Sequence, residues 1–270
     1  MKSIELRDGQ RLAYESVGNG EPLLLLMGTG APHGFWAGQM DALSALYRVV
    51  AIDWRGTGAS GDFAQIEDGS ASILAGDAAE LIEQLDLGPT HVLGVSLGGA
   101  VGQELALQRP ELVRSLSVHG TWAYSDPWFV EMVEQMACAA RHGGLRGFIR
   151  CVTTWILSPE MHAQQAAQLD VMKREYVQRS GTRVEGVLAH CHADCHIDQR
   201  ARLPGLEVPT LVAVGERDIQ VPPRYGHEVQ RLIPNAKLHT FRGPRSSHCA
   251  LLEMADEFTG VTRDFLATVG

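Results

Sequence analysis

The sequence lacks an apolar run long enough to cross a membrane. The longest such run near its start, residues 23–27, is far shorter than the roughly 20 residues that a spanning helix needs. The first ten residues carry charges where a signal peptide would have its apolar segment. We therefore expect a cytoplasmic protein that has no membrane partner.

Cysteine and positive charge are also scarce. The five cysteines are odd in number and widely spread, which excludes a disulfide framework and fits a reducing compartment. The 23 Lys and Arg residues are outnumbered by 32 Asp and Glu residues, for a net charge of −9. An acidic chain has no general attraction for phosphate backbones or anionic lipid. We expect no nucleic-acid partner, and the composition does not indicate an oligomeric state.

Hydrophobic residues and glycine are plentiful. Hydrophobic residues make up 45% of the 270 residues and charged residues 20%, which excludes a disordered chain or a fibre. The 29 glycines form no repeat and therefore indicate many tight turns. A chain of this length can bury a large core without a disulfide or a metal ion.

Short apolar runs alternate with helical patterns along the chain. An apolar run of strand length indicates a strand that is buried on both faces, as in parallel sheets. The predicted buried strands are residues 23–27, 47–52, 90–95, 113–118, 209–214 and 236–241. Apolar stripes predict helices over residues 73–85, 97–109 and 251–265, and two shorter strands fall within residues 1–20. The predicted fold class is α/β, with a mostly parallel central sheet and helices on both faces.

One long segment breaks this alternation. Residues 123–202 contain no strand pattern, whereas helical stripes run from Trp128 to Met136 and from Phe148 to Ile156. We therefore divide the chain into a core of residues 1–122 and 203–270 and a helical insertion of residues 123–202. We expect the insertion to form a lid, and Trp122, Trp128 and Trp155 to line a substrate pocket.

The strongest chemical signal is Gly94-Val95-Ser96-Leu97-Gly98. It follows a predicted buried strand and opens a predicted helix, as a nucleophilic serine at a strained turn requires. Flanking glycines remove the Cβ atoms that would clash in such a turn. The start of the helix places N–H groups beside the serine oxygen. Ser96 is therefore the predicted nucleophile.

A nucleophilic serine needs a base, and the base needs a group that orients it. His248 follows the last predicted strand, and Asp218 follows the strand before it. Ligands bind open α/β sheets beyond the carboxyl ends of their strands, so both side chains are expected near Ser96. Asp194 and Asp198 are alternative orienting carboxylates, but neither follows a buried strand.

These motifs resemble those of the α/β-hydrolase fold superfamily, of the serine esterase and lactonase type. The resemblance covers almost the whole chain and includes the order Ser96, Asp218, His248 and the run from Asp53 to Ser60. From Leu203 onward the chain is similar to 3-oxoadipate enol-lactonases. The superfamily carries its lid where this chain has its insertion.

The resemblance also implies an oxyanion hole. Members of the superfamily usually have His-Gly after the first buried strand, where this chain has Met27-Gly28-Thr29. Backbone donors do not require the histidine, so the N–H groups of Thr29 and Leu97 are the implied donors. The Met-Gly variant is similar to that of polyketide methylesterases.

Two further patterns have competing interpretations. Residues 56–61 fit the glycine pattern of a dinucleotide site, but such a site needs a helix to begin there, and Asp62 and residues 68–70 favour a loop. Residues 190–196 contain Cys and His at a helical spacing that could hold zinc. No second pair at ligand spacing completes that site, so we expect no metal ion and no cofactor.

The resulting hypothesis is a serine hydrolase that cleaves a carboxylic ester or lactone, a small-molecule substrate, through an acyl-enzyme. A carbon–carbon bond hydrolase, a perhydrolase or an acyltransferase would use the same three residues on another electrophile or acceptor. A non-catalytic ligand-binding protein is the alternative of another class.

Overall fold

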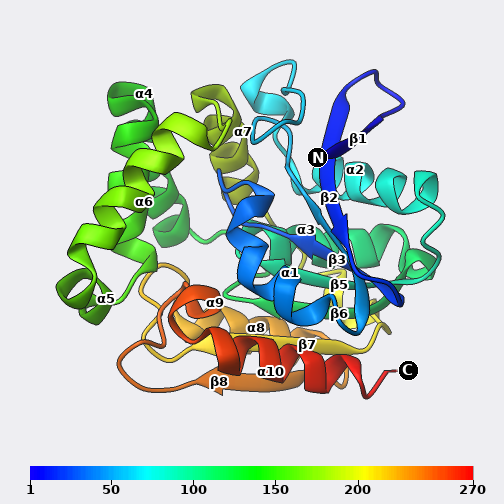
Figure 1. Ribbon diagram of the computed structural model, residues 1–270. Coiled ribbons are helices and arrows are strands. Elements are labelled where there is room, and N and C mark those ends of the chain that lie inside the picture. The colour runs from blue at the N-terminus through cyan, green and yellow to red at the C-terminus, as the bar shows by residue number, and fades with distance from the viewer. Residues whose placement is uncertain (270) are drawn as a thin grey trace.

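The computed structural model describes residues 1–269 and contains an eight-stranded sheet with helices on both faces (Figure 1). The strand order is β1-β2-β4-β3-β5-β6-β7-β8. The β1–β2 and β2–β4 pairs are antiparallel and the remaining pairs are parallel. The predicted fold class is confirmed. The strands are β1 (Lys2–Glu5), β2 (Arg11–Val17), β3 (Glu21–Leu26), β4 (Tyr47–Ile52), β5 (Thr90–Val95), β6 (Val113–His119), β7 (Thr210–Gly215) and β8 (Lys237–Phe241).

Two layers of helices enclose the sheet. The helices are α1 (Ala37–Leu43), α2 (Ala71–Gln84), α3 (Leu97–Gln108), α4 (Pro127–Ile156), α5 (Pro159–Gln164), α6 (Ala166–Arg179), α7 (Val184–Cys195), α8 (Pro223–Leu232), α9 (Ala250–Glu253) and α10 (Ala255–Leu266). Leu24 and Leu26 of β3 pack into the core that contains α2, α3 and α8. Leu23 and Leu25 pack into the core that contains α1 and α10. Both faces of β3 are therefore buried, which explains its apolar sequence. None of the helices formed by residues 1–269 is long and apolar enough to span a membrane.

Two predicted helical patterns differ from the observed elements. The stripe predicted over residues 251–265 is divided into α9 and α10, because the backbone leaves the helical conformation at Met254. The two stripes predicted in residues 128–156 lie in one element, α4, which changes direction at Gly144, where φ is 59°. Asp126 begins α4 by accepting a hydrogen bond from the Phe129 N–H group at 2.9 Å.

Residues 123–202 leave the sheet after β6 and return to it before β7. They contain α4, α5, α6 and α7, and their strand-like pairing is limited to one isolated bridge between Tyr124 and Asp198. The outgoing and returning chains run side by side, since the Ser125 N–H donates to the Ile197 carbonyl at 2.9 Å. Figure 1 shows α4, α5 and α6 beyond one end of the strands.

The start of α7 packs directly on the core. A Cβ atom on Gly186 would overlap the backbone of Gly56, in the loop after β4, and a Cβ atom on Gly56 would overlap the backbone of Gly186. Gly56 also has a φ of 81°, which favours glycine. The Arg183 N–H donates to the Gly56 carbonyl at 2.9 Å. Backbone therefore touches backbone where the insertion meets the core.

We predict that Gly186→Ala lowers the free energy of unfolding by about 1–3 kcal/mol, because neither backbone can move away from the added methyl group. Urea unfolding measures the change. The matched control is Gly76→Ala in α2, where an added Cβ meets no atom within 4 Å. That substitution should stabilise the protein by about 0.5–1 kcal/mol. An equal increase in the free energy of unfolding in both variants would contradict the close contact between Gly186 and Gly56.

Candidate active site

Ser96 lies in a strained turn between β5 and α3. Its φ of 57° and ψ of −125° are unfavourable for a residue with a side chain. The Ser96 N–H donates to the His119 carbonyl at 2.9 Å, and the Ser96 carbonyl accepts from the Thr121 hydroxyl at 3.0 Å. Bonds to the chain around the end of β6 therefore hold the turn in place.

The glycines around Ser96 allow α3 to start close to the sheet. A Cβ atom on Gly98 would overlap the Leu26 carbonyl, and one on Gly94 would overlap the Gly98 carbonyl. Because no larger residue fits at either position, the Gly-x-Ser-x-Gly pattern is a packing requirement of this turn. The turn places Ser96 at the carboxyl end of β5 and at the first turn of α3.

His248 and Asp218 lie against each other beyond the ends of β8 and β7. His248 Nδ1 is 2.7 Å from Asp218 Oδ2, and both side chains are buried. The other carboxylate oxygen, Oδ1, accepts the N–H groups of Gln220 at 2.9 Å and Val221 at 2.8 Å. Those two bonds orient the carboxylate toward the imidazole.

The competing carboxylates lie elsewhere. Asp198 is on the protein surface, where one of its oxygens lies 2.7 Å from Arg200 Nη2. Asp194 is buried beside Thr29, with its Oδ2 atom 2.6 Å from the Thr29 hydroxyl. Of the three aspartates considered from the sequence, Asp218 is the one that contacts His248.

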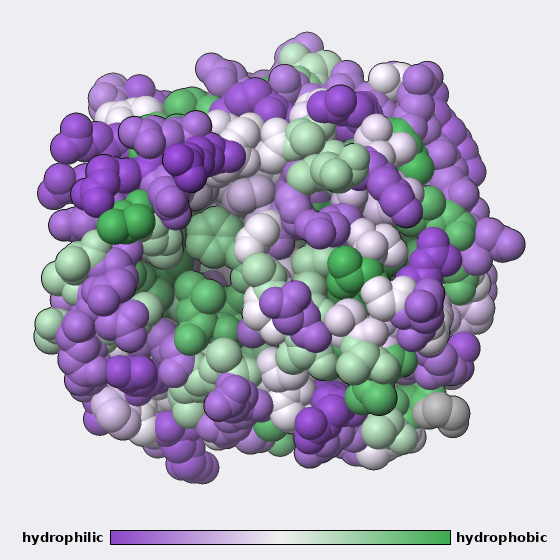
Figure 2. All heavy atoms as spheres, in the orientation of Figure 1, coloured by the Kyte–Doolittle hydropathy of each residue, from purple (hydrophilic) through white to green (hydrophobic). Residues whose placement is uncertain are grey.

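Ser96 and His248 line one cavity, with a volume of about 80 Å³. Its other walls are mostly apolar and come from the β3 loop, α4, α6 and α9. The inserted helices contribute Met136, Phe148, Ile149, Val152, Thr153, Ile156, Met172 and Tyr176. Figure 2 shows a hollow with hydrophobic walls between α6 and α9, two of the elements that supply this lining.

None of the three tryptophans predicted to line a pocket is in this cavity wall. Trp122 is buried against Phe129, with 4.3 Å between the ring centroids. Trp128 is 45% exposed at the start of α4, beside the guanidinium group of Arg224. Trp155 is partly buried and packs against the core on the α2, α3 and α8 side of the sheet. The stripe of α4 that faces Ser96 is instead formed by Phe148, Val152 and Ile156.

The loop after β3 runs directly beside the serine. A Cβ atom on Gly28 would lie 3.6 Å from Ser96 Oγ. In the described part of the chain, neither the Thr29 N–H nor the Leu97 N–H donates a hydrogen bond to another group. The Leu97 N–H also belongs to the first turn of α3, where the helix dipole favours negative charge.

Gly30 in this loop is held by residues of the insertion. Its N–H donates to His190 Nδ1 at 3.0 Å, and its carbonyl accepts from the hydroxyls of Tyr176 at 2.9 Å and Thr182 at 3.1 Å. The opposite ring nitrogen, His190 Nε2, donates to the Arg55 carbonyl at 2.9 Å. Burial lowers the pKa of His190 to about 4, so the ring is neutral at pH 7 and can accept from Gly30.

Asp194 holds the neighbouring residue, Thr29. Its carboxyl group is fully buried, and within residues 1–269 the Oδ1 atom has no hydrogen-bond partner. Burial raises the pKa of Asp194 to about 8, so the carboxyl is mostly protonated at pH 7. The α7 helix thus supplies one neutral imidazole and one neutral carboxyl to the loop beside Ser96.

The possible zinc ligands His192, His196 and Cys191 and the glycine pattern of residues 56–61 do not line the Ser96 cavity. His192 and His196 stack with their ring centroids 4.1 Å apart, and Cys191 is buried with a pKa raised well above its ordinary value by desolvation. Among residues 1–269, no group of three or more His, Cys, Asp or Glu side chains is arranged to hold a metal ion. Residues 56–61 form a loop in which the Ala59 N–H donates to Asp53 Oδ2 at 2.9 Å, and no helix begins there.

The roles of His190 and Glu253 were not predicted from the sequence. Glu253 Oε1 accepts the Ser158 N–H at 2.8 Å and the Ser247 hydroxyl at 2.6 Å. It therefore ties the loop that carries His248 to the start of α5. His190 stands in the Cys/His pattern of residues 190–196, but its partners, Gly30 and Arg55, lie far away along the chain, so that pattern did not indicate this role. Glu253 stands in no motif.

A family model described as alpha/beta hydrolase fold matches residues 21–253. The chain belongs to the α/β-hydrolase fold family. Among curated relatives of this α/β-hydrolase, a protein named "Putative carbamate hydrolase RutD" from Azorhizobium caulinodans is 33% identical over 233 residues, or 84% of each chain. The crystal structure of the enol-lactonase from Burkholderia xenovorans is 26% identical, with a TM-score of 0.88 over 98% of this chain and 100% of that one.

A thermophilic esterase from Thermogutta terrifontis is 25% identical to this α/β-hydrolase, with a TM-score of 0.87 over 99% of this chain and 98% of that one. Together the family model, the relatives and the solved structures place the α/β-hydrolase among the hydrolases of its family, of esterase and lactonase type.

We predict that Asp194→Asn flattens the pH dependence of stability. The pKa of the Asp194 carboxyl is about 8 in the folded protein, against an ordinary value of 3.8. Between these values the folded state holds a proton that the unfolded state has lost, so this group makes the free energy of unfolding fall as pH rises from about 4 to about 8. Asparagine has the shape of the neutral carboxyl and does not titrate. The variant should therefore gain stability relative to the parent protein between pH 5 and pH 8, as measured by urea unfolding.

The matched control is Asp198→Asn, which removes an exposed carboxylate that pairs with Arg200. The pKa of Asp198 is lowered by that pairing, so this group does not titrate between pH 5 and pH 8. In Asp198→Asn the free energy of unfolding should therefore still fall over this range, as in the parent protein. If the free energy of unfolding changed with pH in the same way in the parent protein and in Asp194→Asn, no neutral carboxyl would be buried at this position.

Proposed function

We propose that this α/β-hydrolase is a serine hydrolase that cleaves a small carboxylic ester or lactone through an acyl-enzyme. One observation carries the proposal. Ser96, in a strained turn at the start of α3, lines the same cavity as His248, whose Nδ1 atom lies 2.7 Å from Asp218. Nucleophile, base and orienting carboxylate are the three parts that serine acyl transfer needs.

In the proposed first step, His248 Nε2 takes the Ser96 proton as the serine oxygen attacks the substrate carbonyl. Asp218 accepts a hydrogen bond from the Nδ1–H group, which sets the imidazole tautomer and stabilises the imidazolium. The alcohol then leaves with the proton from His248. Water attacks the resulting ester of Ser96 by the same route in reverse order and releases the acid.

The Thr29 and Leu97 N–H groups are the proposed donors to the tetrahedral oxyanion. Support comes from their position beside Ser96 and from the lack of other acceptors for them within residues 1–269. Loss of one such donor typically costs about 3–4 kcal/mol of transition-state stabilisation. The hydrogen bonds from α7 and α6 to Gly30 and Thr29 would keep the Thr29 N–H in place before the reaction starts.

The helices α4–α7 are proposed to form the lid of the site. They supply much of the apolar wall of the cavity. Its volume of about 80 Å³ has room for roughly five water-sized groups. This size favours substrates with short groups next to the carbonyl.

A carbamate is the second candidate substrate. The observation that favours it is the 33% identity to the relative named as a carbamate hydrolase. A carbamate carbonyl could be attacked by the same serine, and the released amine or ammonia would distinguish it from an ester. A panel of short esters, lactones and carbamates, with product analysis, separates the two candidates and also reveals acyl transfer, perhydrolysis or carbon–carbon cleavage.

We predict that Ser96→Ala abolishes both turnover and labelling by a fluorophosphonate, because the nucleophile is gone. Turnover should fall by about six powers of ten, the loss typical of a removed serine nucleophile. Mass spectrometry of the labelled parent protein should find one adduct, on Ser96. Ser72→Ala, an exposed serine at the start of α2, is the matched control and should label normally. An adduct on another serine would refute the assignment.

We predict that Asp218→Asn lowers kcat about 10⁴-fold, because the amide favours the wrong imidazole tautomer. Asp198→Asn removes an exposed carboxylate from the returning chain and should leave kcat unchanged. Steady-state kinetics on a short ester measure both variants, and circular dichroism confirms their folds. Near-normal turnover in Asp218→Asn would mean that another group orients His248.

A further inference from the structure

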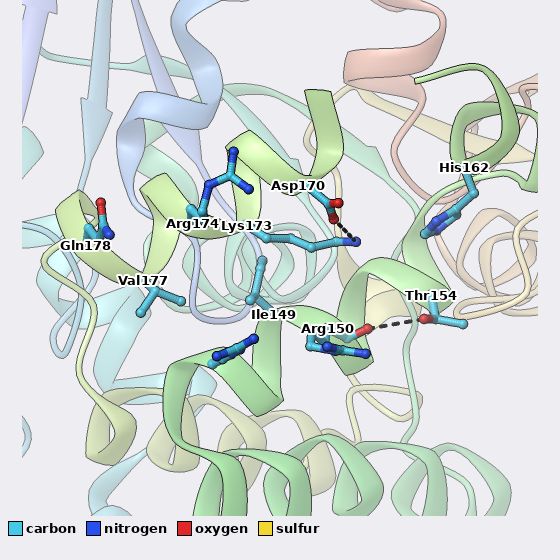
Figure 3. A pocket seen from close by; sticks show the side chains of 10 residues that line it. Ile149, Arg150, Thr154, His162, Asp170, Lys173, Arg174, Val177 and Gln178 are labelled. Carbon is cyan, nitrogen blue, oxygen red and sulfur yellow. Dashed lines mark hydrogen bonds and ion pairs between the residues drawn. The ribbon is translucent and has the colours of Figure 1, made fainter. Parts of the chain in front are cut away.

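A second, larger cleft lies between the latter half of α4 and α6 (Figure 3). Its volume is about 810 Å³. Arg146 and Arg150 line it from α4, and Lys173 and Arg174 line it from α6. Figure 3 shows the Lys173 side chain in the space between the two helices, where its ammonium group ends beside Asp170.

The cleft is basic in a protein that is acidic overall. Asp170 is the one carboxylate in its lining, and it lies 3.7 Å from Lys173 Nζ. Arg146, Arg150 and Arg174 form no ion pair with any acidic side chain of residues 1–269, whereas most arginines of this chain are paired. Given a net charge of −9, this gathering of unpaired positive charge is local.

These cations also repel one another. Arg146 and Arg150 are four residues apart on one helix, a spacing at which like charges destabilise the helix. Lys173 and Arg174 line the same cleft from α6. His162 adds a further titratable side chain to the same lining. An anion in the cleft would remove this repulsion, and guanidinium groups bind carboxylate or phosphate through two parallel hydrogen bonds.

The cleft adjoins the cavity that contains Ser96. Ile149 lines both. On α4, Val152 and Ile156 face the cavity while Arg150 faces the cleft. On α6, Met172 faces the cavity and Lys173 the cleft. The two spaces therefore lie on adjacent faces of the same pair of helices, with the Ile149 side chain as a shared wall.

We propose that the cleft binds an anionic end of the substrate, a carboxylate or a phosphate, while the scissile carbonyl lies at Ser96. This proposal rests on the proposed function, because it needs the carbonyl to be attacked in the neighbouring cavity. The substrate would be short and apolar next to the carbonyl and would reach the cleft past Ile149. A neutral chain of equal length would place an apolar end among the cations and gain nothing there.

The test compares two esters that differ in one terminal group, monomethyl adipate and methyl hexanoate. Acid release in a pH-stat gives kcat/KM for each. The parent protein should prefer the adipate ester, and 0.5 M NaCl should weaken that preference. In the double variant Arg150→Gln/Arg174→Gln, kcat/KM for the adipate ester should fall about tenfold to a hundredfold, the loss of charge-assisted hydrogen bonds. The value for methyl hexanoate should stay within about twofold of the parent value, because that ester makes no such bonds.

Arg231→Gln is the matched control. Arg231 is exposed on α8 and forms no ion pair within residues 1–269, so its removal changes net charge without touching the cleft. Both esters should react normally in this variant. Arg231→Gln removes one positive charge and the double variant removes two. If adipate hydrolysis fell as much per charge removed in Arg231→Gln as in the double variant, net charge and not the cleft would attract the substrate, which would overturn the proposal.

Binding can also be measured without turnover. Titration calorimetry of disodium adipate into the Ser96→Ala protein should show binding that weakens about tenfold or more in Ser96→Ala/Arg150→Gln/Arg174→Gln. Inorganic phosphate serves as a second probe. If phosphate competes with adipate, the cleft also accepts phosphate groups, and phosphorylated substrates become candidates. Exclusive binding of phosphate would assign the cleft to such substrates, while no binding of either anion would overturn the proposal.

The two hypotheses fail in different ways. Hydrolysis of methyl hexanoate with no response of the adipate ester to the cleft variants would reject the cleft and keep the serine hydrolase. Absence of ester hydrolysis and of fluorophosphonate labelling would reject the proposed function, whatever the calorimetry shows.

Discussion

The turn at Ser96 is the constraint on which the rest of the site depends. Its strained backbone costs on the order of 1–3 kcal/mol and persists because α3 starts in contact with the Leu26 carbonyl. That contact is possible only with Gly98 at the start of the helix. Because β3 and β5 are paired neighbours in the sheet, the loop that follows β3 begins beside the turn that follows β5, which brings Gly28 close to Ser96.

The ends of the neighbouring strands position His248 and Asp218 near Ser96. A Cβ atom on Gly120, just after β6, would lie 3.1 Å from the His248 ring, so the end of β6 forms a floor beneath the imidazole. Asp218 comes from the end of β7 and His248 from the loop after β8. Parallel strands place their carboxyl ends at one edge of the sheet. Residues far apart in the sequence therefore meet without any local motif that joins them.

The sequence predicted best those features that depend on local chemistry. The strands could be recognised because both faces of β3 and its neighbours are buried, and Ser96 because its turn tolerates only glycine at Gly94 and Gly98. The cavity wall could not be recognised. Which face of α4 meets Ser96 depends on the change of direction at Gly144 and on packing against α6, neither of which a helical stripe encodes. The absence of strand patterns around Trp128 does not encode where a side chain points, whereas burial against Phe129 and exposure at the helix start determine where Trp122 and Trp128 lie.

The contact between Gly56 and Gly186 affects how the inserted helices are held over the Ser96 cavity. It anchors α7, and the bonds from Glu253 to Ser158 and from the Cys249 N–H to the Ile156 carbonyl anchor the end of α4. Between these two fixed points lie α5 and α6, and the Tyr176 hydroxyl of α6 donates to the Gly30 carbonyl. Since α6 carries Met172 on one side and Lys173 on the other, the position of this one helix sets both the wall of the Ser96 cavity and the width of the basic cleft.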